Sequence, residues 1–308
     1  MSAQMRQALV LGANGFIGRW VTRELERRGV PLVLVTRGDL PPDLASGASR
    51  IRADLAVEGE AQRIVREVRP SHVFNLAGYG VLRDQQNAAL AEVLNHHLVR
   101  ELTTACAAQG NDQGTVLVHV GSAAEYGSVL GAWREDGPTQ PASTYGTTKL
   151  AGTRALVEVA RTLGTPATCA RLFTVFGHGE APGRLFPTLL AASTRTDPIP
   201  LSAGTQERDF AWVGDVAPAL VDLALASWAP GSVVNLASGR MHTVQAFVRA
   251  AASALGIPTS RLQFGAVPSL PGDGTGVTVA VERMQQVLGR VLPGDLDDVV
   301  RRAVARQR

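Results

Sequence analysis

The stretch Val10-Leu11-Gly12-Ala13-Asn14-Gly15-Phe16-Ile17-Gly18 decides the fold of this chain, because its glycine-rich turn joins two recognisable elements. Residues 8–11 form a short apolar run with the length of a buried strand. Apolar side chains then recur at helical spacing at Phe16, Ile17, Trp20, Val21 and Leu25. Gly29 and Pro31 follow and predict the end of this helix.

A strand, a glycine turn and a helix in this order gather unpaired amide N–H groups and the positive end of the helix dipole at one point, where a pyrophosphate can bind. The glycines are spaced G-x-x-G-x-x-G, whereas most dinucleotide folds have G-x-G-x-x-G. Glycines also occur in turns that only tighten a strand-to-helix connection. The flanking elements favour phosphate binding, and we predict cofactor contacts at Gly12, Asn14, Gly15, Phe16, Ile17 and Gly18.

The composition is that of an ordered globular protein. The 308 residues are 45% hydrophobic and 19% charged, which is enough for a large core. Lys and Arg number 30 against 27 Asp and Glu and are scattered, so nucleic acid is not an expected partner. Cys106 and Cys169 lie in apolar stretches, where we expect reduced core thiols, and no Cys/His spacing indicates a metal site.

Targeting and membrane signals are not evident in the sequence. Residues 1–6 lack an apolar signal segment, and no apolar run reaches the roughly eighteen residues of a membrane-spanning helix. We therefore expect a soluble, cytoplasmic protein with no membrane partner.

Apolar runs alternate with helical patterns as far as Arg171, which predicts an α/β fold with a Rossmann-type, right-handed, doubly wound parallel sheet. Further strands are expected at 31–36, 50–53, 73–78 and 115–120, and helices at 61–68, 88–108 and 147–163. We assign residues 1–172 to a dinucleotide-binding domain. From residue 173 the chain is richer in Pro and Gly, so 173–308 is expected to be mainly a smaller C-terminal substrate-binding lobe, with parts of 208–240 completing the sheet.

The residue that follows the second expected strand, Arg37, bears on the choice of cofactor. An acidic residue at this place binds the adenosine ribose hydroxyls of NAD, whereas an arginine pairs with the 2′-phosphate of NADP. No acidic residue follows the strand before Asp39, so we predict NADP(H). The alternative is an exposed arginine without a ligand.

Ser122, Tyr145 and Lys149 are the candidate catalytic residues. Ser122 ends the fifth expected strand, and Tyr145 and Lys149 are four residues apart on one helix face. The Lys149 ammonium is expected to lower the pKa of the Tyr145 phenol toward the working range and to bind the nicotinamide ribose. Ser122 would hold the reacting oxygen for proton transfer. A Tyr-x-x-x-Lys pair is common in helices and by itself indicates little. Here the pair follows a strand that ends in Gly-Ser, which favours a catalytic role.

These motifs together resemble the extended, nucleotide-sugar-modifying branch of the short-chain dehydrogenase/reductase superfamily. The resemblance covers nearly the whole chain and continues through Asp54-Leu55, Asn95, Tyr126-Gly127, Arg171-Leu172-Phe173, Phe176-Gly177 and Arg208-Asp209-Phe210. It implies that Asp54 and Leu55 contact the adenine, although Asp54 would serve equally well as a helix cap. The small residues of Leu76-Ala77-Gly78 leave room for the nicotinamide ribose and the phosphates.

The resemblance also implies a nucleotide-diphosphate sugar as substrate. Arg184 and Arg208 would bind the diphosphate, because a guanidinium meets phosphate oxygens bidentately. The remaining predicted substrate contacts are Ser122, Ala123, Thr174, Leu185 and Phe186, with Pro187 beside the base. In the family, helices equivalent to 88–108 and 147–163 pair in a four-helix contact, so a homodimer is expected.

The chain departs from the family pattern at three places, which together comprise four residues. Ala123-Ala124 stands where the 4,6-dehydratases carry Asp-Glu, and without a carboxylate to move the C5 proton we expect no dehydration. Glu125, one place later, leaves a shifted acid as an alternative. Thr174 replaces a frequent Asn, and His178 replaces a usual Pro.

The sequence therefore predicts an NADPH-dependent 4-ketoreductase of an NDP-4-keto-6-deoxyhexose. A first alternative is an NDP-sugar 4-epimerase, which uses the same Ser, Tyr and Lys and retains NAD. A second is a non-catalytic NADP-binding sensor on the same fold. Intact Ser122, Tyr145 and Lys149 argue against the sensor, which has no use for a perturbed phenol.

Overall fold

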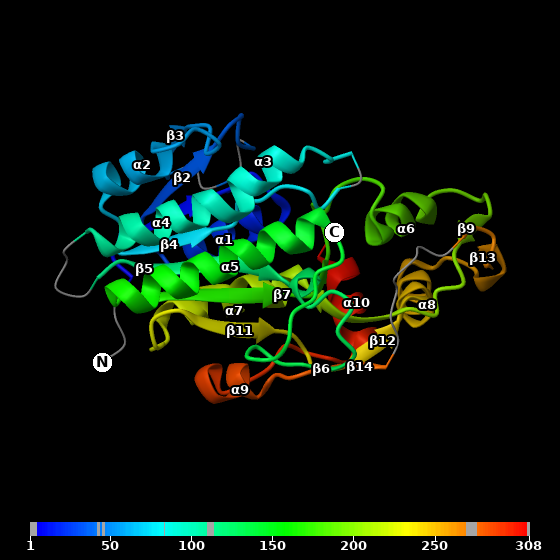
Figure 1. Cartoon of the computed structure of the whole chain (residues 1–308). Coiled ribbons are helices and arrows are strands. Elements are labelled where there is room, and N and C mark those ends of the chain that lie inside the picture. Colours follow the sequence, from blue (N-terminus) through cyan, green and yellow to red (C-terminus); the bar gives the residue numbers. More distant parts are fainter. Residues whose placement is uncertain are drawn as a thin grey trace.

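A computed structural model describes residues 5–41, 44, 47–82, 84–109, 114–268 and 276–306. Its centre is a seven-stranded sheet in the order β11-β7-β5-β4-β1-β2-β3, with all neighbouring strands parallel (Figure 1). The strands are β1 (Ala8–Leu11), β2 (Leu32–Thr36), β3 (Ser49–Arg52), β4 (His72–Asn75), β5 (Val116–Ser122), β7 (Ala167–Leu172) and β11 (Ser232–Leu236). The predicted doubly wound parallel sheet is thus confirmed.

The position of β1 explains why the glycine turn is central. All four residues of β1 are buried, as expected for a strand covered on both faces. Leu11 at its end pairs with Val35 of β2 on one side and with Asn75 of β4 on the other. The chain order reverses at β1, so the carboxyl ends of these strands border the crevice where doubly wound sheets bind ligands.

Helices cover both faces of the sheet, and each layer has its own core (Figure 1). One face carries α1 (Phe16–Arg27) and α7 (Val213–Leu225), which pack on each other. The other carries α2 (Glu60–Val68), α3 (Ala88–Glu92), α4 (Leu98–Ala107) and α5 (Thr144–Leu163). The buried side chains Val21, Leu25 and Leu220 belong to the first core, and Ile64, Leu102 and Leu156 belong to the second.

The helix expected over 88–108 is regular only at its ends. A π-helical turn, Val93–His97, separates α3 from α4, and the Leu98 N–H bonds to the Val93 carbonyl five residues back. The prediction of one uniform α-helix is therefore wrong here. A tertiary contact accompanies the distortion: a Cβ at Gly152 of α5 would lie 1.9 Å from the Asn95 carbonyl oxygen, so the two backbones touch at this turn.

The rest of the chain forms a lobe beyond the carboxyl edge of the sheet, with α9 (Glu282–Leu288) beside β11 (Figure 1). A three-stranded sheet joins β8 (Thr174–Phe176), β10 (Glu207–Trp212) and β12 (Met241–Thr243). The strand pairs β9 (Ile199–Leu201) with β13 (Leu262–Phe264) and β6 (Gly131–Trp133) with β14 (Val277–Val279) flank it. Its helices are α6 (Leu185–Ser193), α8 (Val244–Leu255) and α10 (Leu296–Ala305).

Four phenylalanines, Phe176, Phe186, Phe210 and Phe247, pack ring against ring in the core of the lobe. Strand β11 comes from the C-terminal half of the sequence yet lies in the central sheet, so the two parts interleave. A division into domains at residue 172 remains a prediction.

Cys106 and Cys169 are both buried and unpaired with another cysteine. Within the ranges described above, none of the helices has the length and apolarity that crossing a bilayer requires.

Candidate active site

The glycine turn holds its backbone segments too close together for other residue types. Gly12 has φ +75°, and a Cβ there would lie 2.7 Å from the Ala77 nitrogen. A Cβ at Gly18 would lie 2.1 Å from the Gly12 carbonyl oxygen. Gly15 is the N-cap of α1 and offers the helix no side-chain cap. This close-packed helix start fits the pyrophosphate of a dinucleotide, which accepts from backbone N–H groups there.

Asn14 links the turn to the loop that follows β2. Its Nδ2 donates to the Asp39 carbonyl oxygen at 3.0 Å, and its Oδ1 accepts from Arg19 Nη2 at 2.8 Å. Phe16 and Ile17, at the start of α1, pack partly against the core. The side chains of these three residues therefore position the turn within the fold.

Arg37 is exposed directly after β2. Arg52, the last residue of β3, donates from Nε to the Arg37 carbonyl oxygen at 3.1 Å. Two arginines thus lie at the carboxyl ends of neighbouring strands, on the side of the sheet edge next to the glycine turn. Arg52 is not among the predicted cofactor residues, although it lies near the end of the third expected strand, 50–53.

Asp54 closes a local turn after β3. Its Oδ1 accepts from the Ala56 N–H at 3.0 Å, and Leu55 beside it is buried. The N-cap of the following helix α2 is Gly59, so the alternative of Asp54 as a helix cap is wrong. Its carboxylate instead stabilises an Asx-turn at the edge of the sheet.

The segment Leu76-Ala77-Gly78 follows β4, which ends earlier than expected, at Asn75. The Leu76 N–H bonds to the Leu11 carbonyl oxygen at 3.0 Å, so the segment lies against the glycine turn. A Cβ at Gly78 would approach Asn95 Oδ1 to 3.2 Å. Larger side chains would therefore crowd this side of the crevice.

Ser122 and Tyr145 are brought together by the start of α5. Ser143 is the N-cap of this helix and accepts from the Gly146 N–H at 3.1 Å. A Cβ at Gly146 would lie 2.4 Å from the Ala124 carbonyl oxygen, so the helix start rests on the short turn that follows Ser122. The Tyr145 and Ser122 side chains line the same cleft, as the predicted chemistry requires.

Lys149 lies one turn further along α5 and is 3% exposed. Its Nζ donates to the Val120 carbonyl oxygen of β5, and burial lowers the pKa of the amine. Desolvation likewise raises the pKa of Tyr145 to about 12, and the neighbouring Ser122 hydroxyl opposes this rise. The expectation that Lys149 lowers the phenol pKa is therefore wrong for this structure, because desolvation dominates and the amine bonds to Val120 instead.

Asn95 ties the loop after β4 to α5. Its Oδ1 accepts from the Tyr79 N–H at 3.0 Å, and its Nδ2 donates to the Tyr79 carbonyl oxygen at 2.7 Å and to Thr148 Oγ1 at 3.0 Å. The side chain is fully buried. Asn95 therefore holds the helix that carries Tyr145 against the segment that follows Gly78.

Both carboxylate oxygens of Glu125 bind other groups of the protein. Its Oε1 accepts from the Ser122 N–H at 2.8 Å, and its Oε2 lies 2.8 Å from Arg171 Nε. The residue is fully buried and does not line the cleft that contains Ser122 and Tyr145. The arrangement argues against a shifted dehydratase acid at this position.

Two neighbouring clefts contain the predicted substrate residues. The first cleft is lined by the candidate catalytic residues Ser122 and Tyr145 and by Phe173, together with residues 80–82 and 85–88. The lobe cleft is lined by apolar and polar side chains, among them Thr174, Leu185, Phe186, Arg208, Val248 and Phe264. Arg184 lines both clefts, so it stands at their junction. Ala123 lines neither, and Phe186 is 1% exposed, so it contributes mainly to the wall.

Arg184 is held in place by Glu180, which the sequence analysis did not identify. Arg184 Nε lies 3.1 Å from Glu180 Oε1, and burial raises the pKa of this carboxyl group. Glu180 lines the lobe cleft, and its buried Oε2 has no hydrogen-bond partner among the described residues. Arg208 donates from Nη1 to the Glu207 carbonyl oxygen.

His178, the residue in place of the usual proline, has an exposed side chain. Its carbonyl oxygen accepts from Trp20 Nε1 at 2.9 Å, which connects the loop to α1. The contact is made by the backbone, so it does not depend on the imidazole.

Comparison with known proteins identifies the family of the chain. The model of the NAD dependent epimerase/dehydratase family matches residues 8–237. The chain belongs to this family, which confirms the resemblance to the extended short-chain dehydrogenases/reductases.

Relatives of similar sequence are named for several reactions. The chain is 31% identical to a dTDP-4-dehydrorhamnose reductase of Streptomyces griseus over 232 residues, 74% of this chain and 69% of the relative. It is 30% identical to a dTDP-6-deoxy-L-talose 4-dehydrogenase (NAD(P)(+)) of Kitasatospora kifunensis, covering 91% of this chain and 87% of the relative. A UDP-glucose 4-epimerase of Corynebacterium glutamicum is 28% identical, with coverages of 91% and 89%.

A solved structure is similar over almost the whole chain. MoeE5 in complex with UDP-glucuronic acid and NAD superposes with a TM-score of 0.83 at 30% identity, covering 98% of this chain and 99% of MoeE5. Fold and family are therefore established, and the particular reaction depends on the residues of the site.

Proposed function

We propose that the protein is an NADPH-dependent reductase of the C4 ketone of an NDP-4-keto-6-deoxyhexose. The observation that carries this proposal is the position of Arg184 at the junction of the two clefts, with Ser122 and Tyr145 in one of them. A sugar beside Tyr145 would place its diphosphate at Arg184 and its nucleoside in the lobe cleft. The order of these sites along the two clefts matches the order of sugar, diphosphate and nucleoside in such a substrate.

The hydroxyl groups of Ser122 and Tyr145 would have different roles at the ketone oxygen. Ser122 holds this oxygen by a hydrogen bond, and Tyr145 delivers a proton to it as the alcohol forms. A phenol with the ordinary tyrosine pKa of about 10 is protonated at neutral pH, the form that a general acid needs, and burial raises the pKa of Tyr145 further. When bound, NADPH supplies the hydride to C4. Lys149 would hold the nicotinamide ribose, and Tyr145 would regain its proton from solvent.

The preference for NADPH rests on Arg37. Its guanidinium, with that of Arg52 on the neighbouring strand, offers the cation that a 2′-phosphate needs. We propose that the adenosine end lies here, with the adenine near Asp54 and Leu55 and the pyrophosphate on the glycine turn. A cytoplasmic location fits this proposal, since reduced NADP is abundant there.

The rest of the substrate would be held mainly in the lobe cleft. Arg184 and Arg208 are proposed to bind the diphosphate, and Thr174, Leu185 and Phe186 would contact the nucleoside side of the cleft. We further propose that two copies of the chain pair through α4 and α5, the helices that the family resemblance indicates.

The main alternative is a 4-epimerase, favoured by the similarity to UDP-glucose 4-epimerases. An epimerase must first remove a proton from the sugar alcohol, which requires a base at Tyr145. Arg37 favours NADP, whose reduced form a reductase consumes, over the NAD that an epimerase retains. The reductase and dehydrogenase relatives support the same choice.

The proposal is tested by mixing the purified protein with an NDP-4-keto-6-deoxyglucose and NADPH. We expect the nicotinamide absorbance to fall as one 4-hydroxy product forms per NADPH consumed, and Tyr145→Phe serves as the inactive control. Interconversion of C4-hydroxyl NDP-sugars without net NADPH loss would instead establish the epimerase.

A further inference from the structure

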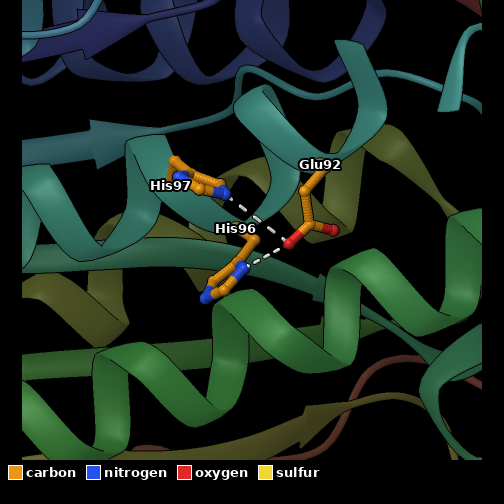
Figure 2. A group of neighbouring side chains, drawn as sticks. All are labelled: Glu92, His96 and His97. Atoms are coloured by element: carbon orange, nitrogen blue, oxygen red, sulfur yellow. Dashed lines mark hydrogen bonds and ion pairs between the residues drawn. The ribbon is translucent and has the colours of Figure 1, made fainter. Parts of the chain in front are cut away.

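Three potential metal ligands, Glu92, His96 and His97, meet on the surface of the interrupted helix (Figure 2). His96 Nδ1 lies 2.6 Å and His97 Nε2 lies 3.7 Å from the same Glu92 oxygen, Oε1. The three donor atoms all lie within 4.8 Å of one another. Figure 2 shows both imidazoles turned toward the carboxylate. The proposed reaction uses none of these side chains.

The π-helical turn creates the cluster. In a regular α-helix Glu92 and His96 share a face, being four residues apart, but His97 points away from it. In the turn Val93–His97 the backbone hydrogen bonds join residues five apart. His97 therefore lies on the same face of the helix as Glu92, one turn further along the chain. No spacing rule for regular helices would have found this set, which is why the sequence indicated no metal site.

We propose that Glu92, His96 and His97 bind one divalent transition-metal ion of the zinc type. Two imidazole nitrogens and one carboxylate oxygen are ligands that Zn²⁺ prefers, whereas Mg²⁺ and Ca²⁺ select oxygen ligands. Zn²⁺ is usually four-coordinate, and the side chains are 42%, 26% and 65% exposed, in the order Glu92, His96, His97, so water can occupy the fourth position. The separations require only side-chain adjustment for all three donors to reach one ion.

The site is coupled to the active site through Asn95, which lies between its ligands in sequence. An ion joining residues 92 and 97 clamps both ends of the π turn. Asn95 within that turn holds Tyr79 and Thr148 by its side chain. Metal binding is therefore expected to stabilise the junction between the loop after β4 and the start of α5.

The test is a zinc titration of the full-length chain after removal of any affinity tag, by calorimetry and by thermal unfolding. We expect one Zn²⁺ per chain and a higher melting temperature with zinc, and little response to Mg²⁺. His97→Gln should weaken zinc binding by at least about tenfold, because one of three donors is lost. Light scattering at each zinc concentration separates binding within one chain from bridging between chains.

The matched control is His178→Gln, which removes an exposed histidine outside the cluster and should bind zinc as the wild type does. The doubly substituted His96→Gln/His97→Gln protein should bind no zinc and show no thermal shift. Equal zinc binding by this variant and the wild type, or no binding by the wild type, would overturn the proposal. Neither readout depends on catalysis, so the result is independent of the proposed reductase activity.

Discussion

The carboxylate of Glu125 and the guanidinium of Arg171 form an ion pair of 2.8 Å beneath the active site, with side chains 0% and 4% exposed. The same carboxylate accepts the backbone N–H of Ser122, and Arg171 lies over the Tyr126 ring, 4.6 Å from its centroid. A buried charge pair of this kind is destabilising when one partner is removed, because the other charge is left in a medium that solvates it poorly. The pair therefore fixes the end of β5, where Ser122 lies.

Glu125→Gln should strongly destabilise the protein. The substitution leaves Arg171 charged and buried without its anion, for which we expect a loss of about 3 to 5 kcal/mol in the free energy of unfolding. Urea unfolding followed by circular dichroism measures the change. The control is Glu158→Gln, which removes the exposed partner of Arg100 and should have a much smaller effect. Equal losses in the two variants would contradict the role given to Glu125.

Tyr145→Phe should keep the fold and the cofactor but lower turnover by about a hundred- to ten-thousandfold, because the proton donor is lost. Tyr126→Phe is the matched control. It removes a buried hydrogen bond of 2.6 Å to Asn235 Oδ1, so it should lower the melting temperature while leaving turnover nearly normal. A folded Tyr145→Phe protein with wild-type turnover would exclude the proposed proton transfer and would favour the alternative of a non-catalytic NADP-binding sensor.

Arg37→Asp should reverse the preference for NADPH over NADH. Charged hydrogen bonds to a phosphate are worth about 1.5 to 3 kcal/mol, which corresponds to roughly a ten- to hundredfold preference in the wild type. Calorimetric titration with both cofactors measures it. Arg66→Asp makes the same charge change on the exposed surface of α2 and should leave the preference intact. Comparable affinities for the two cofactors in the wild-type protein would remove the case for NADP.

The fold could be predicted because its signals are local. The strand expected at 8–11 has its predicted bounds and β2 begins one residue later than expected, since short apolar runs between helices and turns mark buried parallel strands. Strand β3 lies one residue earlier than expected at each end. The geometry of the G-x-x-G-x-x-G turn likewise depends on three nearby glycines, Gly12, Gly15 and Gly18.

The features that sequence reasoning missed depend on contacts between distant segments. The π turn at Val93–His97 accompanies a close approach of Gly152, and Lys149 bonds to a backbone carbonyl at Val120 that no motif specifies. Glu180 is recognised only through its contact with Arg184. The raised pKa of Tyr145 follows from burial, which the spacing of Tyr145 and Lys149 does not report.

The protein in solution should be a dimer. Pairing through α4 and α5 predicts a mass of twice the 32.4 kDa of one chain by light scattering at micromolar concentration. Arg154, exposed on α5, lies on the proposed contact, and Arg154→Glu should shift the equilibrium toward the monomer. A measured mass of one chain for the wild type would rule out the α4 and α5 pairing.

Asp209 gives the lobe a pH-dependent stability. This residue of β10 is 1% exposed, and its carboxylate accepts from the Ser238 N–H and hydroxyl and from the Gly239 N–H at 2.8 to 3.1 Å. Burial raises the pKa of Asp209 to about 6, and the hydrogen bonds oppose this rise only in part. The folded protein therefore keeps a proton on Asp209 in a pH range where the unfolded chain has already lost it.

The sign of the effect follows from this difference in bound protons. Between about pH 4 and 6 the unfolded state binds fewer protons at this site than the native state, so the contribution of Asp209 to stability falls as pH rises through that window. Its full size is about 3 kcal/mol, because the pKa of Asp209 rises from an ordinary 3.8 to about 6. Asp209→Asn cannot titrate, so its free energy of unfolding should lack this component. Urea unfolding of both proteins at several pH values measures the difference, and parallel curves for the two proteins between pH 4 and 6 would contradict a raised pKa.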